Sequence, residues 1–323
     1  MTRMLGVNFY LAAEPMYCSV PEDKVVKARN AIQSALGAVW VPADHCQVLL
    51  GILTFHGRIL LSGKWHLAFT VQALKRACEK GVAMMEALWA QELAWWQTLM
   101  ESWNRVTILA PVTFTVFDVQ PFETPFTDAS RSKERLVGGA GAVFRNFYMI
   151  FQFTAREAKY LNIMELEGLV VVLWLTWLCD HHPEAITGRR FVARCDNDPF
   201  VVDVNRRHYT TPTIAFLLGQ IHLLQSRFSF DFRLRYIKSK ENVCADALSR
   251  DDLRAFFAYM QATFNLSPSQ LVCVPVQPTL RSSWTSSLIL MRRSAESTRT
   301  PRGGGSSPPT SGGRGSVVGS AAN

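Results

Sequence analysis

Four acidic residues of this chain stand where the local sequence would bring their carboxylates to one end of a folded sheet. They are Asp128, Glu165, Asp196 and Asp246. Oxygen ligands without a surrounding set of cysteines and histidines favour Mg²⁺ or Mn²⁺ over zinc. Two such cations, about 3.5–4 Å apart, activate water and stabilise a leaving oxygen in phosphodiester cleavage. Because clustered carboxylates repel one another without metal, a purely structural role for all four is disfavoured.

The apolar pattern predicts the elements that would position the first two acids. Residues 126–153 show the alternation of three short antiparallel strands, with Asp128 in the first and a turn at Arg145-Asn146. The apolar stretch 162–179 predicts a buried helix that is too short to cross a bilayer. Glu165 then lies in the first turn of this helix, where a carboxylate suits the helix dipole.

The other two acids follow strands. Residues 190–197 predict a buried strand that ends in Asp196, and residues 230–237 predict an alternating strand that leads to Asp246 at a helix start. The expected element order is strand, strand, strand, helix, strand, helices, strand, helix. This order predicts an α/β fold with a mixed five-stranded sheet flanked by helices.

Each acid alone also has a plain structural interpretation. Taken singly, Asp128 would be a turn residue, Glu165 a charge at a helix start, Asp196 a cap at a strand end and Asp246 a helix N-cap. For any single residue that interpretation is favoured, but the four together favour a metal site.

The segment Tyr236-Ile-Lys-Ser-Lys-Glu-Asn-Val-Cys-Ala-Asp-Ala-Leu-Ser-Arg250 closely resembles the closing motif of retroelement ribonuclease H domains. The resemblance implies a ribonuclease H-like fold over residues 125–265, and it implies that the four acids are that family's metal-binding tetrad. Two neighbouring acids, Glu167 and Asp198, compete for these roles. Glu165 is preferred because Asn162-Ile-Met-Glu-Leu resembles the family's Asn-x-x-Glu-Leu, and Asp196 because Cys-Asp-Asn resembles its Ser-Asp-Asn.

Weaker candidates for contacts with nucleic acid are Asn197, Asn205, Lys238 and Lys240. The closing motif also departs from the family. Related motifs usually read His-Ile-Pro-Gly-Lys-Glu-Asn, whereas this chain has Tyr236, Lys238 and Ser239 at the His, Pro and Gly positions. We expect this difference to affect turnover more than metal binding.

Residues 1–110 predict a mainly helical region. Ser19-Val-Pro-Glu22 has the spacing of a capping box, and helical runs follow at 46–55 and 86–96. Trp95 and Trp96 are interpreted as core packing in preference to a platform for base stacking. The basic residues of this region either contact a duplex or form a solvated helix face. They are Lys64, Lys75, Arg76 and Lys80.

This front region resembles the thumb and connection stretch that precedes ribonuclease H in reverse transcriptases of DIRS/Ngaro-type retrotransposons. The resemblance rests on Leu5-Gly-Val-Asn-Phe9, Leu49-Leu-Gly-Ile-Leu53, Leu93-Ala-Trp-Trp96 and Trp103-Asn104. The family's Tyr-x-Asp-Asp-like turn is absent, since the adjacent pair Asp251-Asp252 follows the closing motif. The resemblance therefore implies the rear part of a reverse transcriptase without DNA synthesis of its own, and the missing polymerase part as a partner.

Composition frames these expectations. The net charge is +8, but residues 276–323 hold six arginines and one glutamate, so about +3 belongs to the rest and supports nucleic-acid binding only weakly.

Seven scattered cysteines suggest free thiols in a reducing compartment. The prolines of 111–124 predict an extended connector, and the Ser-, Gly-, Pro- and Arg-rich residues 276–323 predict a disordered tail. With no signal-peptide core and no membrane span expected, an intracellular protein, cytoplasmic or nuclear, is predicted.

Two functions remain open from the sequence. The first is a metal-dependent endonuclease that cuts the RNA strand of an RNA–DNA hybrid with two Mg²⁺ ions, or Mn²⁺ in their place. The second is a truncated, catalytically inactive retroelement relic that at most binds duplexes. The intact acids favour the first, whereas the absent polymerase core and the altered Tyr236–Ser239 loop favour the second.

Overall fold

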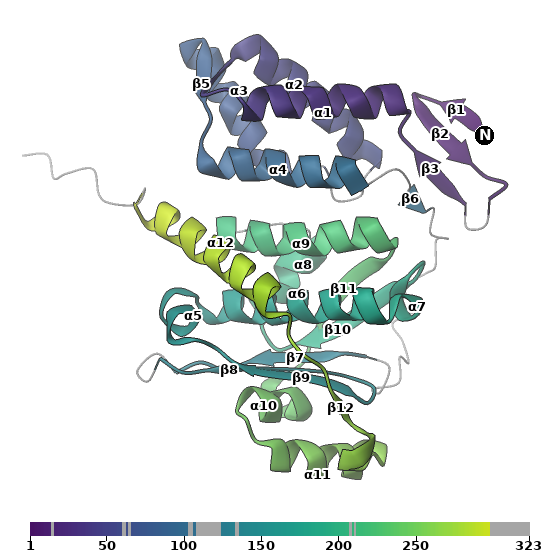
Figure 1. The fold of residues 1–323 in the computed structure, drawn as a ribbon, viewed down its shortest axis with the longest axis vertical. Helices are drawn as coiled ribbons and strands as arrows, with labels where there is room; N and C mark the ends of the chain where they lie inside the picture. Colours follow the sequence, from purple (N-terminus) through teal and green to yellow (C-terminus); the bar gives the residue numbers. More distant parts are fainter. Residues whose placement is uncertain are drawn as a thin grey trace, which may run out of the picture.

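The structure is a computed structural model in which a mainly helical region packs against a mixed α/β region (Figure 1). It describes residues 1–13, 16–59, 63, 66–102, 106–107, 124–132, 136–206, 209 and 211–297. The expected connector lies almost wholly outside these residues, as do Lys64, Trp103 and Asn104. None of the described helices is both long and apolar enough to cross a membrane.

In its described residues, the front region contains four longer helices and two small sheets. An antiparallel sheet has the order β1-β2-β3-β6, formed by Thr2–Met4, Val7–Tyr10, Tyr17–Ser19 and Val106–Thr107. The helices are α1 (Glu22–Leu36), α2 (Ala43–Ile59), α3 (Ala68–Lys80) and α4 (Ala87–Ser102). The short strands β4 (Trp40–Pro42) and β5 (Val82–Met84) pair antiparallel beside them.

The expectation of a mainly helical front region is confirmed, with one local correction. Ser19 does not cap α1, because it ends β3; the N-cap is Pro21, which makes no side-chain capping hydrogen bond. Trp95 and Trp96 are both buried, as the core interpretation requires. Lys75, Arg76 and Lys80 are exposed on α3, and Arg76 forms an ion pair with Glu86, so a solvated helix face and a contact with a duplex both stay open.

The second region is built on a six-stranded mixed sheet of order β11-β10-β7-β8-β9-β12. Three consecutive antiparallel strands form one part: β7 (Phe126–Ala129), β8 (Gly139–Phe144) and β9 (Phe147–Gln152). Arg145 has a φ of 57° in the turn between the last two, where that turn was predicted. Strands β10 (Arg190–Cys195) and β11 (Asp231–Tyr236) add parallel pairing on the other side of β7.

The expected five strands are all present, but a sixth was not predicted. Strand β12 (Val272–Cys273) pairs parallel to β9, and its ladder includes Val272 N–H to the Asn146 carbonyl at 2.8 Å. A two-residue strand carries too little alternation to be recognised in the sequence. The strand forms because the unpaired edge of β9 offers backbone hydrogen-bond partners to residues 272–273.

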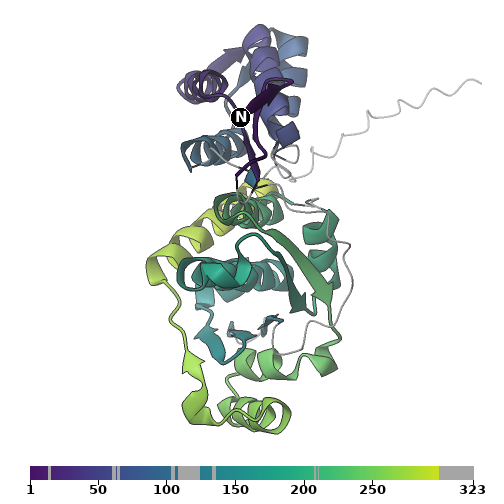
Figure 2. The same cartoon turned by 90° about the vertical axis from the view of Figure 1, so that its right-hand side faces the viewer.

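Helices cover both faces of this sheet (Figures 1 and 2). On one face lie α6 (Ile163–His181) and α9 (Pro212–Phe228), with α8 (Asp198–Arg206) beside them and the short α5 (Ala155–Tyr160) and α7 (Pro183–Ile186) at either end of α6. On the other face lie α10 (Val243–Ser249) and α11 (Leu253–Phe264), joined to β11 through a short 3-10 helix at Ser239–Glu241. Most residues of α6 are buried, which agrees with the long apolar run that predicted it.

The expectation of a disordered tail is wrong for its first part, because Pro278–Ser297 forms helix α12. Trp284, Leu288 and Met291 recur at helical spacing, and Leu288 and Met291 are fully buried. Arg281 and Arg292 form ion pairs with the buried carboxylates of Glu157 and Glu165. The sequence analysis missed this amphipathic pattern because the segment is rich in serine and arginine. Residues 298–323 lie outside the described part of the chain.

The two regions meet where α4 packs on α9. The indole N–H of Trp95 donates to the Gly219 carbonyl at 2.8 Å. His66 stacks on Trp95 and shares a 2.9 Å hydrogen bond with His222. Burial lowers the pKa of His66 to about 3, so the His66 ring is neutral at this contact.

Candidate metal centre

Two of the expected acids lie side by side because their strands are parallel neighbours. Asp128 is the third residue of β7 and is 5% exposed. Asp196 directly follows β10, whose last residue, Cys195, pairs with Thr127. Continuing that register by one residue places Asp196 opposite Asp128, so both carboxylates lie at the same end of the sheet.

Helix α10 brings Asp246 to this end of the sheet. The side-chain amide of Asn242, which is fully buried, donates to the Thr127 carbonyl at 3.0 Å, immediately before Asp128. At the other end of α10, the hydroxyl of Ser130 donates to the Ser249 carbonyl at 2.6 Å. These two bonds fix α10 to β7, and Asp246 lies in the helix between them.

Glycine allows this helix to approach β8 closely. A Cβ added to Gly141 would lie 2.5 Å from both the Ala245 carbonyl oxygen and the Leu248 Cβ. A Cβ at Gly139 would lie 2.3 Å from the Ser249 carbonyl oxygen. Glycines at positions 139 and 141 therefore allow α10 to pack directly on β8, which positions the carboxylate of Asp246.

Helix α6 contributes Glu167 to the cluster, whereas the sequence favoured Glu165. Glu167 is 5% exposed; its Oε2 accepts from the Cys195 thiol at 3.0 Å, and its Oε1 from the Asn197 amide at 3.4 Å. Both partners flank Asp196, so the Glu167 carboxylate lies next to that of Asp196. The sequence analysis had preferred Glu165 because of its motif resemblance.

Glu165 is engaged in structural contacts. Its Oε2 accepts from the Asn162 backbone N–H at 2.7 Å, in a reciprocal capping box. The Thr213 hydroxyl donates to Oε1 at 2.6 Å, and Arg292 of α12 donates to Oε2 at 2.7 Å. Side chains two positions apart in an α-helix point about 200° away from each other, so Glu165 and Glu167 cannot both face the cluster. The structure therefore gives Glu165 the contacts of a helix-capping residue and places Glu167 beside Asp196.

The pKa values of two carboxyls in the cluster are raised because the acids are buried and lie close to one another. Burial, followed by the negative charges of Asp196 and Asp246, raises the pKa of Asp128 to about 7. Burial, again joined by the charges of Asp196 and Asp128, raises the pKa of Glu167 to about 8. The Oδ1 atom of Asp196 is buried without a hydrogen-bond partner among the described residues. Such an unpartnered oxygen is costly unless a cation or water completes it.

The donor set fits a hard cation. Glu167, Cys195 and Asp196 each place one ligand atom within 4.8 Å of the others. However, burial raises the pKa of the Cys195 thiol well above its ordinary value, so it remains protonated and donates to Glu167. The atoms available to a metal are therefore carboxylate oxygens, which suit Mg²⁺ or Mn²⁺. These oxygens belong to Asp128, Glu167, Asp196 and Asp246.

The weaker candidates for nucleic-acid contacts separate into two groups. Asn197 orients Glu167 and caps α8, and its Oδ1 accepts from Phe200 N–H at 3.1 Å. Both polar atoms of the Asn205 amide bind β11, since Oδ1 accepts from Leu234 N–H at 3.0 Å and Nδ2 donates to the Leu234 carbonyl. Both asparagines hold neighbouring protein groups, and their contact with nucleic acid stays a prediction. Lys238 and Lys240 are exposed, so their role stays a prediction.

Two side chains near the cluster were not predicted from the sequence. The Ser239 hydroxyl, in the loop that departs from the family pattern, donates to Asp196 Oδ2 at 2.7 Å. The Arg250 guanidinium donates to Asp246 Oδ1 at 2.8 Å from one turn away. The helical i,i+4 spacing could have indicated Arg250, whereas Ser239 reaches Asp196 across 43 residues of sequence.

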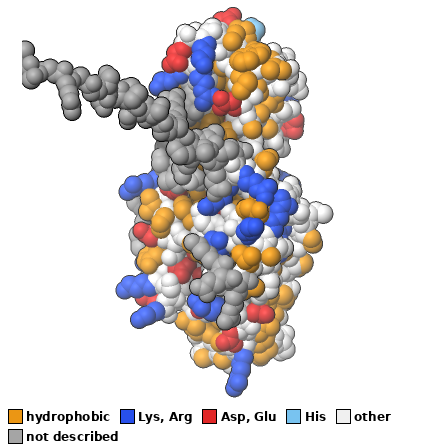
Figure 3. Space-filling model, turned by 90° about the vertical axis from the view of Figure 1, so that its left-hand side faces the viewer, with side chains coloured by type: hydrophobic (Ala, Val, Ile, Leu, Met, Phe, Trp, Pro, Cys, Tyr) orange, Lys and Arg blue, Asp and Glu red, His pale blue; other side chains and the backbone are white. Residues whose placement is uncertain are grey.

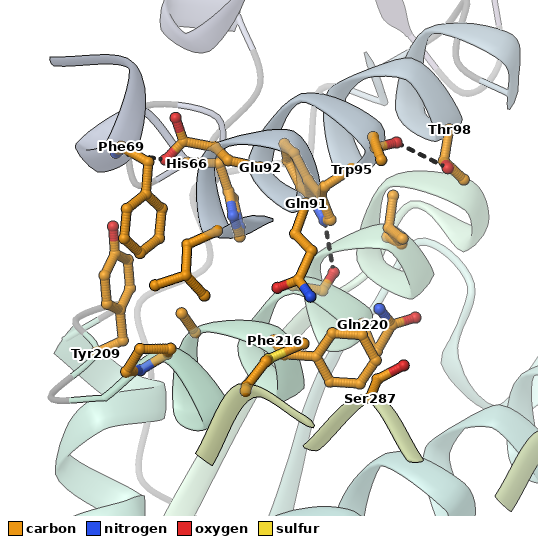
Figure 4. Close-up of a pocket in the computed structure, with 17 residues that line it drawn as sticks. His66, Phe69, Gln91, Glu92, Trp95, Thr98, Tyr209, Phe216, Gln220 and Ser287 are labelled. Atoms are coloured by element: carbon orange, nitrogen blue, oxygen red, sulfur yellow. Dashed lines mark hydrogen bonds between the residues drawn. The ribbon is translucent and has the colours of Figure 1, made fainter. Parts of the chain in front are cut away.

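A separate cavity of about 300 Å³ lies between α4, α9 and α12 (Figure 4). Its lining is mainly apolar, and the buried carboxylate of Glu92 at its edge is satisfied by Phe69 N–H, Thr70 N–H and the Thr70 hydroxyl. The cavity includes none of the clustered acids. It is therefore a feature of the contact between the two regions, distinct from the metal centre.

A scan of family models and a search of curated proteins found no match to this chain.

Proposed function

We propose that this chain is a metal-dependent endonuclease of the ribonuclease H type, which cleaves the RNA strand of RNA–DNA hybrids. The observation that carries the proposal is the gathering of Asp128, Glu167, Asp196 and Asp246 at one end of the sheet, with a buried oxygen left unpartnered. The motif resemblance at 236–250 and the agreement between the observed and expected element order support it further.

The four carboxylates would hold Mg²⁺ or Mn²⁺, which supplies activation of water and stabilisation of the leaving oxygen in phosphodiester cleavage. The chain's own residues orient these ligands. Cys195 and Asn197 hold Glu167, Ser239 holds one oxygen of Asp196, and Arg250 holds Asp246. Such supporting hydrogen bonds fix the direction of ligand oxygens. Selection of the RNA strand would come from its 2′-hydroxyls and groove shape.

We further propose that this sequence is the rear part of a retroelement reverse transcriptase, and that it acts together with the polymerase part. The support is the sequence resemblance of the front region and the absence of the Tyr-x-Asp-Asp-like turn. Primer extension by the purified chain should give no incorporation of nucleotides. Incorporation would contradict this part of the proposal.

The test of cleavage uses the whole chain, because α12 packs into the α/β region. A labelled RNA–DNA hybrid and a DNA duplex of the same sequence are incubated with Mg²⁺ and either the natural chain or Asp196→Asn. We expect cleavage of the hybrid's RNA strand, no cleavage of the DNA duplex and loss of activity in the variant. A folded natural chain that cuts neither substrate with Mg²⁺ or Mn²⁺ would favour the inactive relic.

A further inference from the structure

Helix α12 is held against α5 by buried polar contacts. The Nε of Arg281 donates to Glu157 Oε1 at 3.0 Å, and the Thr285 hydroxyl donates to the same oxygen at 2.8 Å. The Arg281 guanidinium also lies 4.3 Å from the centre of the Phe151 ring. Because Glu157 is 2% exposed, these bonds are shielded from water and fix the two helices side by side.

The same two helices also expose three cations at their surface. Arg156 and Lys159 are exposed on α5, and Arg293 is exposed on α12. Among the described residues, no carboxylate forms an ion pair with any of the three. Tyr160 lies between the helices, with the Arg293 guanidinium 4.4 Å and the Lys159 ammonium 5.3 Å from its ring centre. We call Arg156, Lys159 and Arg293 the α5–α12 basic surface.

Short segments of chain connect this basic surface with the clustered acids. Arg292, the neighbour of Arg293, binds Glu165 in the first turn of α6, the helix that also carries Glu167. Arg131, three residues after Asp128, lies close enough to Arg292 for the two charges to interact. Lys and Arg side chains gather on this face, right of centre in Figure 3, where α5 and α12 lie.

We propose that the α5–α12 basic surface binds the phosphate backbone of the nucleic-acid duplex whose strand reaches the metal centre. This inference rests on the proposed function, which it extends to a substrate contact supplied by α12. Uncompensated Lys and Arg charges bind phosphates without reading bases. The ring of Tyr160 holds Arg293 and Lys159 close together, so that the charges are presented on one face.

The experiment measures binding separately from cleavage. The full chain carrying Asp196→Asn is titrated against a fluorescent RNA–DNA hybrid, with and without the added substitutions Arg156→Gln, Lys159→Gln and Arg293→Gln. A matched control carries Arg3→Gln, Lys27→Gln and Arg58→Gln, three exposed cations of the front region. Binding is measured by anisotropy between about 50 and 200 mM salt, because each lost phosphate contact lowers the salt slope by about 0.9.

We expect the basic-surface variant to bind at least tenfold more weakly, with a salt slope smaller by about 2–3, while the control changes less than about twofold. Unchanged binding by the basic-surface variant, or equal weakening by the control, would overturn the proposal. So would a variant that keeps hybrid binding but loses binding to vesicles rich in anionic phosphatidylserine, since the surface would then serve a membrane. If the natural chain binds through this surface but cuts nothing, only the proposed cleavage fails.

Discussion

Buried carboxylates occur in both regions of the molecule, and their surroundings differ. In the front region, Glu92 is 6% exposed and accepts hydrogen bonds from two backbone N–H groups and one hydroxyl. In the α/β region, Asp128 and Glu167 are as deeply buried, yet they face other carboxylates, and Asp196 keeps an unpartnered oxygen. A buried acid with a full set of donors stabilises the fold, whereas buried acids that face one another are the feature on which the proposed cation site rests.

The same contrast separates Glu165 from Glu167 and gives the largest expected effect. Glu167→Gln should lower Mg²⁺-dependent cleavage by about 10²-fold or more, since several kcal/mol of charge stabilisation depend on the metal ligands. Glu165→Gln should leave cleavage nearly intact and lower the free energy of unfolding by about 1–3 kcal/mol, because the charged bond to Arg292 is weakened. Cleavage assays and urea unfolding of both variants check this; the reverse pattern in folded proteins would contradict the assignment.

The next prediction concerns the packing of α10 on β8. Gly141→Val should lower the free energy of unfolding by about 1–3 kcal/mol and reduce cleavage, because the new side chain would displace α10 and Asp246. Gly51→Ala is the matched control, since a Cβ there meets nothing within 4 Å in the interior of α2. We expect that control to be as stable as the natural chain or slightly more stable. Full cleavage by Gly141→Val would show that α10 does not position Asp246.

A third prediction concerns pH in the absence of metal. The pKa values of the Asp128 and Glu167 carboxyls are about 7 and about 8 in the folded protein, compared with about 4 in the unfolded chain. Between these values the folded protein binds more protons, so its free energy of unfolding should fall as the pH rises from about 4 to about 8. Thermal unfolding in EDTA should show a Tm several degrees lower at pH 8 than at pH 5, with a flatter profile for Asp128→Asn. Mg²⁺ should raise the Tm most at pH 8, and a Tm that instead rises with pH in EDTA would contradict the crowding of these acids.

The smallest effect is expected at the contact between the two regions. Trp95→Phe removes the hydrogen bond to the Gly219 carbonyl and should lower the free energy of unfolding by about 1 kcal/mol, with cleavage unchanged. Calorimetry and the cleavage assay together measure this. A loss of cleavage without a loss of stability would mean that the front region shapes the metal centre, and the two regions could not be treated separately.

Local patterns in the sequence were enough to predict the strands, α6 and the positions of Asp128 and Asp196, because strand alternation and strand ends are short-range signals. Glu165 was preferred because motif resemblance outweighed helix geometry, although Asn162-x-x-Glu165 is itself a capping-box pattern. That pattern could have pointed to Glu167 as the acid left for a metal. Helix α12 was missed because its composition hid the apolar spacing of Trp284, Leu288 and Met291.

The central claim is that Asp128, Glu167, Asp196 and Asp246 bind divalent cations together. It is tested most directly by crystals of the full chain grown with Mn²⁺, in which anomalous scattering locates the metal. We predict a peak within coordination distance of Asp128, Glu167 and Asp196. A well-ordered structure in saturating Mn²⁺ with no peak there, or with the metal bound at Glu165, would contradict the account.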